Sequence, residues 1–304
     1  MMRTVLLEFS QSERLARWVT SNGVTRSMAR RFVAGEELDD AIAAARACNQ
    51  ARRMVSLDYL GENVAGEADA RRACDAYLGI FDRIAEEQLD ANVSLKLTQL
   101  GLDLSEELCQ SLVETIVERA ASYGNFVRVD MEGSPHTHRT IELVKRVRDR
   151  STAIGVVIQS YLYRSEQDVK DLLRIGCRIR LCKGAYKEPP EIAFPRKADV
   201  DANFVKLMQL LLQSGIYHGI ATHDRRMIAA TIRFATEHGI LKDQFEFQML
   251  YGIRTDFQQK LVRDGYRMRV YIPYGRDWFP YFMRRLAERP ANLMFFVRNL
   301  FRAG

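Results

Sequence analysis

Residues 155–181 read GVVIQSYLYRSEQDVKDLLRIGCRIRL and hold the clearest structural pattern in the chain. The stretch begins with a β-branched run at 155–159 and ends with a second apolar run at 178–181. Between them, residues 165–175 place apolar side chains at helical spacing, and Ser165 stands where it could cap that helix. A strand, an amphipathic helix and a second strand in this order predict a βαβ unit with two parallel strands.

The same alternation continues on both sides of this unit. Eight short apolar or β-branched runs are separated by helical segments, which favours a closed parallel βα barrel, like a TIM barrel, over an open sheet. No G-x-G-x-x-G follows the first run, which disfavours a Rossmann domain. The predicted strands are residues 54–59, 92–97, 126–130, 155–159, 178–181, 218–222, 245–249 and 267–271.

The two ends of the chain differ from this pattern. Residues 1–50 contain no strand-like run and are predicted to form helices at 10–19, 27–34 and 37–48. We therefore expect an N-terminal helical extension at 1–50 and a catalytic barrel domain at 51–290. Residues 291–304 are apolar and aromatic with two arginines, which predicts an amphipathic helical tail that either docks on the barrel or meets a membrane.

Composition excludes several classes of protein. The 304 residues are 47% hydrophobic and 28% charged, which is typical of a folded chain and too apolar for a disordered one. The net charge is +6, but basic and acidic residues alternate, so we expect no nucleic-acid partner. The five cysteines form no C-x-x-C pair, and the N-terminus lacks a signal-peptide pattern, so we expect reduced thiols and a cytoplasmic location.

Polar residues gather at the ends of the predicted strands, where βα barrels carry their active sites. Charged groups are expensive to bury, so mutual pairing or a polar ligand must compensate them. Their number at one end of the barrel favours a ligand site over structural ion pairs alone. The strand ends carry Asp58, Lys96, Asp130, Glu132, Gln159, Arg180, Lys183, Thr222, His223, Glu246, Gln248 and Tyr271.

The last predicted helix, starting near residue 277 or 280, brings more polar groups to this end. Spacings of three and four residues place Tyr281 and Glu288 on the same helical stripe as Arg284 and Arg285. Two guanidinium groups beside an acid and an aromatic ring can hold a small carboxylate through paired hydrogen bonds. The sequence therefore predicts a carboxylate site on this helix.

Other patterns leave alternatives open. Lys96 and Lys183 near strand ends are compatible with a Schiff-base aldolase, because a desolvated lysine can attack a carbonyl. His136 and His138 could belong to a metal cluster, but Pro135 before them indicates a loop or a helix start, and we predict no metal site. The segment 183–188 combines a flexible glycine, a cation and an aromatic ring, which suits a flat, phosphate-bearing cofactor.

Taken in order, eight segments resemble the proline dehydrogenase family, the flavoenzymes that oxidise proline in the first step of its catabolism. The joint match is specific because the order and the spacing of the segments agree over about residues 90 to 290. The segments are SLKL at 94–97, RVD at 128–130, VIQ at 157–159, RLCKGAY at 180–186, ATHD at 221–224, FEFQMLYG at 245–252, VYIPYG at 270–275 and YFMRRLAE at 281–288.

The resemblance implies a distorted eight-stranded barrel that holds FAD non-covalently and binds L-proline over the reactive face of the flavin. Lys96, Arg284 and Arg285 would clamp the proline carboxylate, with Asp130 paired to Lys96 and Glu288 paired to the arginines. The wall around the pyrrolidine ring would consist of Tyr186, Leu250, Tyr271 and Tyr281. Of these, Tyr281 would disfavour a substrate with an added hydroxyl.

The resemblance also assigns the residues that would hold FAD. Gln159 would contact the flavin ring system and Arg180 would lie near the flavin N5. The remainder of the cofactor would be held by Lys183, Gly184, Ala185, Thr222, His223 and Glu246.

Hydride transfer from proline C5 would yield pyrroline-5-carboxylate, with the electrons passed on to a quinone. We expect a stand-alone bacterial type, peripheral membrane association, and handover of the product to pyrroline-5-carboxylate dehydrogenase. A 4-hydroxyproline oxidase, a methylenetetrahydrofolate-reductase-like flavoenzyme and the lysine aldolase remain as alternative functions.

Overall fold

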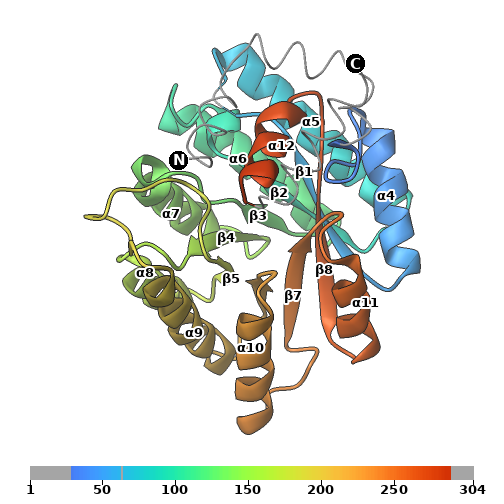
Figure 1. Ribbon diagram of the computed structural model, residues 1–304. Helices are drawn as coiled ribbons and strands as arrows, with labels where there is room; N and C mark the ends of the chain where they lie inside the picture. Colours follow the sequence, from blue (N-terminus) through green and yellow to red (C-terminus); the bar gives the residue numbers. More distant parts are fainter. Residues whose placement is uncertain (1–28, 63, 289–304) are drawn as a thin grey trace, which may run out of the picture.

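The eight apolar runs expected to be strands all form strands, and these close into a parallel barrel in chain order (Figure 1). The computed structural model describes residues 29–62 and 64–288. It confirms the predicted fold class. The strands are β1 (Met54–Tyr59), β2 (Ala91–Leu95), β3 (Val127–Val129), β4 (Ile154–Gln159), β5 (Arg178–Cys182), β6 (His218–Ala221), β7 (Phe245–Leu250) and β8 (Arg267–Tyr274).

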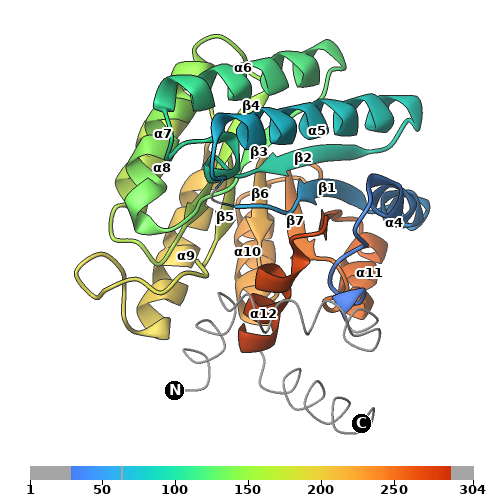
Figure 2. The ribbon, with the colours of Figure 1, turned by 90° about the horizontal axis from the view of Figure 1, so that it is seen from above.

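Helices alternate with the strands and form the outer layer (Figure 2). Pairing of β1 with both β2 and β8 closes the barrel, since Val55 is in register with Ala91 on one side and Val270 on the other. The helices are α4 (Leu38–Gln50), α5 (Glu67–Glu86), α6 (Glu106–Ser122), α7 (Ser134–Arg148), α8 (Ser165–Arg174), α9 (Lys197–Gln213), α10 (Arg225–Glu237), α11 (Thr255–Arg263) and α12 (Trp278–Glu288), with a short 3₁₀ turn at Thr98–Leu100.

The barrel departs from a regular alternation at its last helix. In the outer layer, α4 packs against β1 and β8, and its buried residues Ala41, Ile42 and Ala45 join the main core. Helix α12, which follows β8, lies instead at the end of the barrel toward which the strands point (Figure 1). We call this end, formed by the C-terminal residues of the strands, the mouth. The displaced last helix therefore brings its side chains to the mouth.

The two faces of the strands have opposite character. Val55 and Leu57 of β1 belong to the apolar core between strands and helices, whereas Ser56 and Asp58 between them are buried polar residues. Ser56 Oγ lies 3.0 Å from Ser94 Oγ of the neighbouring strand. Since side chains alternate along a strand, the polar set faces the barrel interior. The interior is thus lined partly by hydrogen-bonding groups instead of aliphatic layers.

One local prediction is confirmed and two are corrected. The helix expected at 37–48 is α4, whereas the one at 10–19 and the tail at 291–304 lie outside the described residues. Of the helix expected at 27–34, Ala29 is helical and residues 30–32 form a turn, so the helix does not continue to residue 34. Ser165 is the first residue of α8, and its hydroxyl donates to the Gln159 carbonyl at 2.5 Å, so it does not cap the helix. Within the described part of the chain, every helix is too short or too polar to cross a membrane.

Candidate active site

Lys96, the residue after β2, forms a buried ion pair with Asp58 near the end of β1. Its Nζ lies 2.9 Å from Asp58 Oδ1, and the two side chains are 8% and 0% exposed. Burial acts to lower the pKa of Lys96, but Asp58, Asp130 and Glu62 hold it above its ordinary value. Lys96 is therefore a fixed cation at the mouth. A Schiff-base aldolase needs a neutral amine, so this charge argues against that alternative.

Asp130, the residue after β3, binds Arg180 and Tyr271, so the expected ion pair with Lys96 is replaced by a different one. Arg180 Nη1 lies 2.7 Å from Asp130 Oδ1, and the Tyr271 hydroxyl donates to Oδ2 at 2.7 Å. Side chains from β5 and β8 thus engage both oxygens of Asp130. Asp58, on the other neighbouring strand, is left as the partner of Lys96.

Arg180 is held from several sides inside the barrel. Besides Asp130, its Nη2 lies 3.2 Å from Ser56 Oγ, and its Nε donates to Gln248 Oε1. The guanidinium carbon lies 5.2 Å from the centroid of the Tyr271 ring. Burial and the Asp130 carboxylate raise the pKa of Tyr271 well above its ordinary value, so its hydroxyl remains a donor.

Helix α12 presents Arg284 and Arg285 at the mouth. Arg284 Nη2 lies 2.8 Å from Glu62 Oε1, in the loop after β1. Burial acts to lower the pKa of Arg284, but Glu62 and Tyr186 raise it, so the guanidinium is charged. The Arg285 guanidinium carbon lies 5.1 Å from the centroid of the Tyr281 ring. Glu288 ends α12, but its side chain is not among the described ones, so its pairing with the arginines stays a prediction.

An apolar cluster is formed partly by residues of α12, and three of the four expected wall residues belong to it or pack against it. Tyr281 belongs to this cluster, and Leu250 and Tyr271 pack against it. Phe32 and Phe282 join the same cluster, with ring centroids 6.2 Å apart. Burial raises the pKa of Tyr186. The charges of Glu62 and Arg284 also act on this pKa, which indicates that Tyr186 lies close to both of them. The mouth therefore combines cations with a largely apolar wall.

Gln159, the last residue of β4, offers an open acceptor inside the barrel. Its Nε2 donates to the carbonyls of Met131 and Glu132 at 3.1 and 3.0 Å. This fixes the amide so that Oε1 points away from them, and among the described residues Oε1 is buried with no hydrogen-bond partner. Asp58 Oδ2 has the same status. Such atoms fit a bound molecule that donates hydrogen bonds.

Gly184 is the second residue of the loop after β5, and its backbone conformation strongly disfavours any residue with a side chain. Its φ is +109°, and a Cβ there would overlap the ring of Tyr161. Ala185 and Tyr186 follow in this loop. Glu188 ties the loop to the start of α7, because its carboxylate accepts from the backbone N–H and the hydroxyl of Ser134 at 2.8 and 2.5 Å.

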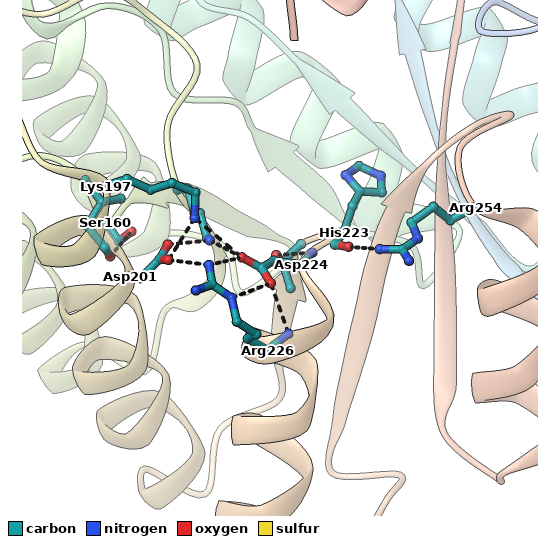
Figure 3. Close-up of polar contacts among 10 residues, drawn as sticks. Ser160, Lys197, Asp201, His223, Asp224, Arg226 and Arg254 are labelled. Carbon is teal, nitrogen blue, oxygen red and sulfur yellow. Dashed lines mark hydrogen bonds and ion pairs between the residues drawn. The ribbon is translucent and has the colours of Figure 1, made fainter. Parts of the chain in front are cut away.

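A charged network at the starts of α9 and α10 includes Asp201, Asp224 and Arg226 (Figure 3), and Lys183 joins it. Its Nζ lies 2.5 Å from Asp201 and 2.8 Å from Asp224. Lys197 and Arg226 each lie 2.8 Å from Asp201 Oδ2. Burial acts to raise the pKa of both aspartates, but these cations lower it. Three cations thus surround two carboxylates, and the excess positive charge suits a phosphate-bearing ligand.

Thr222 and His223 follow β6, and His223 lies beside this network (Figure 3). Thr222 Oγ1 accepts from the Asp224 backbone N–H at 3.1 Å. His223 Nε2 accepts from the Leu250 backbone N–H at 3.0 Å, and its carbonyl accepts from Arg254 Nη1 at 2.7 Å. These bonds fix the β6–α10 turn against the end of β7.

Glu246 is not at the mouth, so its expected place beside the cofactor is corrected. It is the second residue of β7 and pairs in register with Gly219 and Arg267, near the opposite end of the barrel. Its carboxylate binds Arg269 and Tyr217. The predicted strand 245–249 begins at the same residue as β7, so the predicted pattern already placed Glu246 near the start of the strand.

Several residues form hydrogen bonds or ion pairs in the site that the sequence did not predict. Asp58 and Gln248 were noticed at strand ends but given no role, Asp224 stands in the ATHD segment but was given no role, and Glu62 and Asp201 lie in none of the matching segments. For Asp58 the signal was available, because a buried lysine on the adjacent strand requires an acid. For Glu62, Asp201 and Asp224 the pairing depends on how loops and helices meet in space.

His136 and His138 lie in the first turns of α7. His136 Nε2 lies 3.0 Å from Asp103 Oδ2, and Arg139 Nη1 lies 2.9 Å from Oδ1 of the same carboxylate. In the described part of the chain no three His, Cys, Asp or Glu side chains come together as metal ligands would. His136 is thus accounted for by its contact with Asp103.

The fold and the mouth together define a βα barrel of the kind found in enzymes, with fixed cations beside a largely apolar wall at its mouth. The sequence profile described as "Proline dehydrogenase" matches residues 41–298. Proline dehydrogenase 1 of Bacillus subtilis strain 168 is 44% identical over 300 residues, 99% of each chain. Proline dehydrogenase of Deinococcus radiodurans is 41% identical over 298 residues, 96% of this chain and 94% of its own.

A solved structure agrees with these sequence matches. Proline utilization A (PutA) from Bdellovibrio bacteriovorus, inactivated by N-propargylglycine, superposes with a TM-score of 0.82 at 28% identity, over 86% of this chain and 32% of its own. The chain belongs to the proline dehydrogenase family. It is an oxidoreductase and matches the short family members along almost their whole length.

Proposed function

We propose that this enzyme oxidises L-proline to pyrroline-5-carboxylate with FAD as its bound redox cofactor. The overall reaction removes a hydride from C5 of proline and a proton from its nitrogen. FAD, when bound, supplies the hydride acceptor. The observation that carries the proposal is the pair of fixed cations, Lys96 and Arg284, at a mouth whose wall is largely apolar.

The two cations suit the carboxylate of proline. Each is held by its own acid, Lys96 by Asp58 and Arg284 by Glu62. A lysine carries three donors and an arginine five, so both retain donors for a substrate. Charge-assisted hydrogen bonds from fixed donors orient an anion without the entropy cost of ordering them on binding.

The apolar wall suits the rest of the substrate. Leu250, Tyr271 and Tyr281 would pack around the pyrrolidine ring and exclude water from it. Tyr186, on the loop after β5, would complete this wall. Arg285 and Glu288 on α12 would assist Arg284 at the carboxylate.

The residues present fit FAD. Gln159 Oε1 is a buried acceptor with no partner in the described residues, as a flavin ring with N–H groups requires. Gly184 leaves no side chain beside the Tyr161 ring, so backbone can approach a flat ligand closely. Lys183 with its excess positive charge, Ala185, Thr222 and His223 would hold the remainder, and Arg180 would face the flavin's reactive part.

The test is turnover of the FAD-loaded enzyme with L-proline and a soluble dye, with the product trapped as the cyclic imine. The proposal predicts dye reduction matched by imine formation. Faster turnover of 4-hydroxyproline would indicate a hydroxyproline oxidase. Reduction of the flavin by a folate would indicate a methylenetetrahydrofolate-reductase-like enzyme. Trapping of Lys96 by borohydride with a carbonyl substrate would indicate an aldolase instead.

We also propose a quinone as the electron acceptor, with the enzyme bound at the periphery of the cytoplasmic membrane. The apolar, aromatic sequence at 291–304 supports this, although it lies outside the described residues. Removing residues 291–304 should reduce binding to anionic liposomes and spare activity with a soluble dye. Unchanged liposome binding would contradict the membrane proposal.

The product, a reactive cyclic imine, supports a further proposal of handover to pyrroline-5-carboxylate dehydrogenase. Co-sedimentation of the two purified enzymes tests it.

A further inference from the structure

The interior of the barrel carries a chain of hydrogen bonds that runs from the end opposite the mouth up to the mouth. Glu246, 2% exposed, lies near the end opposite the mouth. Its Oε1 accepts from Arg269 Nε at 2.7 Å and from Gln248 Nε2 at 2.5 Å, and its Oε2 accepts from the Tyr217 hydroxyl at 2.8 Å. Gln248 in turn accepts from Arg180 Nε, and Arg180 binds Asp130 at the mouth.

Glu246 decides which way the Gln248 amide points. An ionised carboxylate can only accept hydrogen bonds, so Gln248 must turn its NH₂ group toward Glu246. Its carbonyl oxygen then faces Arg180, which can only donate. Burial acts to raise the pKa of Glu246, but Arg269 and its hydrogen bond hold that pKa below the ordinary value, so the carboxylate is ionised.

The barrel leaves this amide a space of its own. Gly219 of β6 is in register with Glu246, and a Cβ at Gly219 would overlap Gln248 Nε2. The φ of Gly219 is not in the left-handed region, so the need for glycine here is one of space and not of backbone conformation. Gly219 and Glu246 together hold the amide in one orientation.

We infer that Glu246 is a positioning residue that acts through Gln248 to orient the guanidinium of Arg180. The inference rests on the proposed function in one respect, because the proposed function places Arg180 beside the flavin. The three side chains that hydrogen-bond to Arg180 are Ser56 of β1, Gln248 of β7 and Asp130, the residue after β3. Glu246 sets only the Nε side, so its loss should turn the guanidinium without releasing it.

Two substitutions separate this role from simple charge balance. In Glu246→Gln the Arg269 guanidinium loses its carboxylate, which should lower stability. The new amide can still accept from Arg269 and Gln248 with its oxygen while its NH₂ donates to Tyr217, so the orientation of Gln248 is kept. Glu246→Leu removes the acceptor altogether. A charge-balance role predicts that both variants are equally impaired, whereas positioning predicts that only the leucine variant is.

Two further variants make the test independent of whether Glu246→Leu folds. Gly219→Ala displaces the Gln248 amide and leaves Glu246 and Arg269 in place. Tyr217→Phe is the matched control, because it removes one hydrogen bond from Glu246 without touching Gln248.

The measurements are the absorption bands of the bound flavin, its rate of reduction by L-proline, and the ¹⁵N NMR signal of Arg180 Nε–H in the apoprotein, assigned by its loss in Arg180→Lys. We expect Glu246→Leu and Gly219→Ala to shift the NMR signal and the flavin bands and to slow reduction about tenfold. Glu246→Gln and Tyr217→Phe should keep all three within about twofold of the parent protein.

An unshifted Arg180 signal in Gly219→Ala would overturn the inference, as would a Glu246→Gln variant that matches Glu246→Leu. The NMR signal needs no cofactor, so it still reports on Glu246 if the purified protein binds no flavin. In that case the proposed function fails, while the positioning of Arg180 is judged separately.

Discussion

Lys96 and Asp58, on neighbouring strands, form an ion pair of 2.9 Å that is buried at the mouth of the barrel. Buried pairs are weak evidence for stability, because the cost of desolvating two charges offsets most of their attraction. Their presence here is better explained by ligand binding. Asp58 holds the ammonium in place, and its second oxygen has no partner among the described residues.

Replacing Lys96 by Met should weaken proline binding about 10- to 100-fold, the effect of losing one charge-assisted hydrogen bond of ~1.5–3 kcal/mol. Titration of the FAD-loaded variant with a proline analogue measures this. Lys96→Met alone also strands the buried charge of Asp58 and should lose stability. The double variant Lys96→Met/Asp58→Asn is the control, since it should recover stability and not binding. Recovery of binding in it would contradict a direct role for Lys96.

The site groups that bind the substrate should not titrate near neutral pH. The pKa values of Lys96 and Tyr271 are both raised above ordinary values that are already alkaline, so both keep their protons from about pH 6 to 9. The amine of proline gives up hydride more readily when neutral. We therefore expect kcat/KM for proline to rise toward alkaline pH. A flat profile over this range would contradict the assignment of the rise to the substrate amine.

His218 should make stability depend on pH. Its Nδ1 accepts from the Ile179 backbone N–H at 2.9 Å, and its Nε2 lies 3.0 Å from Ser214 Oγ, so the ring is neutral. Burial and the nearby Arg128 lower its pKa from 6.5 to about 3. The unfolded chain binds a proton that the folded chain does not, so stability present above pH 6.5 is lost as the pH falls toward 3.

The expected loss is about 1.4 kcal/mol for each pH unit below the ordinary value. Urea unfolding at several pH values between 7.5 and 5 measures it. In His218→Asn the amide can make the bond to Ile179 and carries no titrating group, so the slope should be shallower by this amount. Equal slopes in the two proteins would show that another group is responsible.

Gly184→Ala should reduce FAD retention. The new Cβ would meet the Tyr161 ring, and the φ of +109° strains any other residue by about 1 kcal/mol or more. Gly239→Ala is a matched control, because Gly239 also has a positive φ and a Cβ there meets nothing within 4 Å. The flavin-to-protein absorbance ratio of the purified variants decides. Equal flavin content in both would exclude Gly184 from the cofactor site.

The fold could be predicted further than the site. Residues 154–158 contain no polar side chain, as is typical of a strand buried on both faces, and this signal does not depend on the rest of the chain. The sequence predicted that the last helix brings polar groups to the mouth, but it did not predict that α4 would pack against β1 and β8 in the outer layer. The identity of the helix that covers each strand is a tertiary property.

The site was predicted as a set of residues better than as a set of contacts. Lys96, Asp130, Arg180 and Tyr271 do come together, but Asp130 binds Arg180 and leaves Lys96 to Asp58. Both acids flank Lys96 on neighbouring strands, and only the shape of the interior decides between them. The expected place of Glu246 was wrong for a different reason: the predicted strand 245–249 already put this residue second, so its grouping with the strand-end residues did not follow from the pattern.

The most direct test of the central claim is the absorption spectrum of the purified enzyme, recorded without oxygen before and after L-proline is added. A bound redox cofactor that takes hydride from proline predicts a flavin spectrum that bleaches on addition. A flavin that proline leaves oxidised would contradict the assigned substrate. A colourless protein that takes up no added FAD would contradict the assigned cofactor.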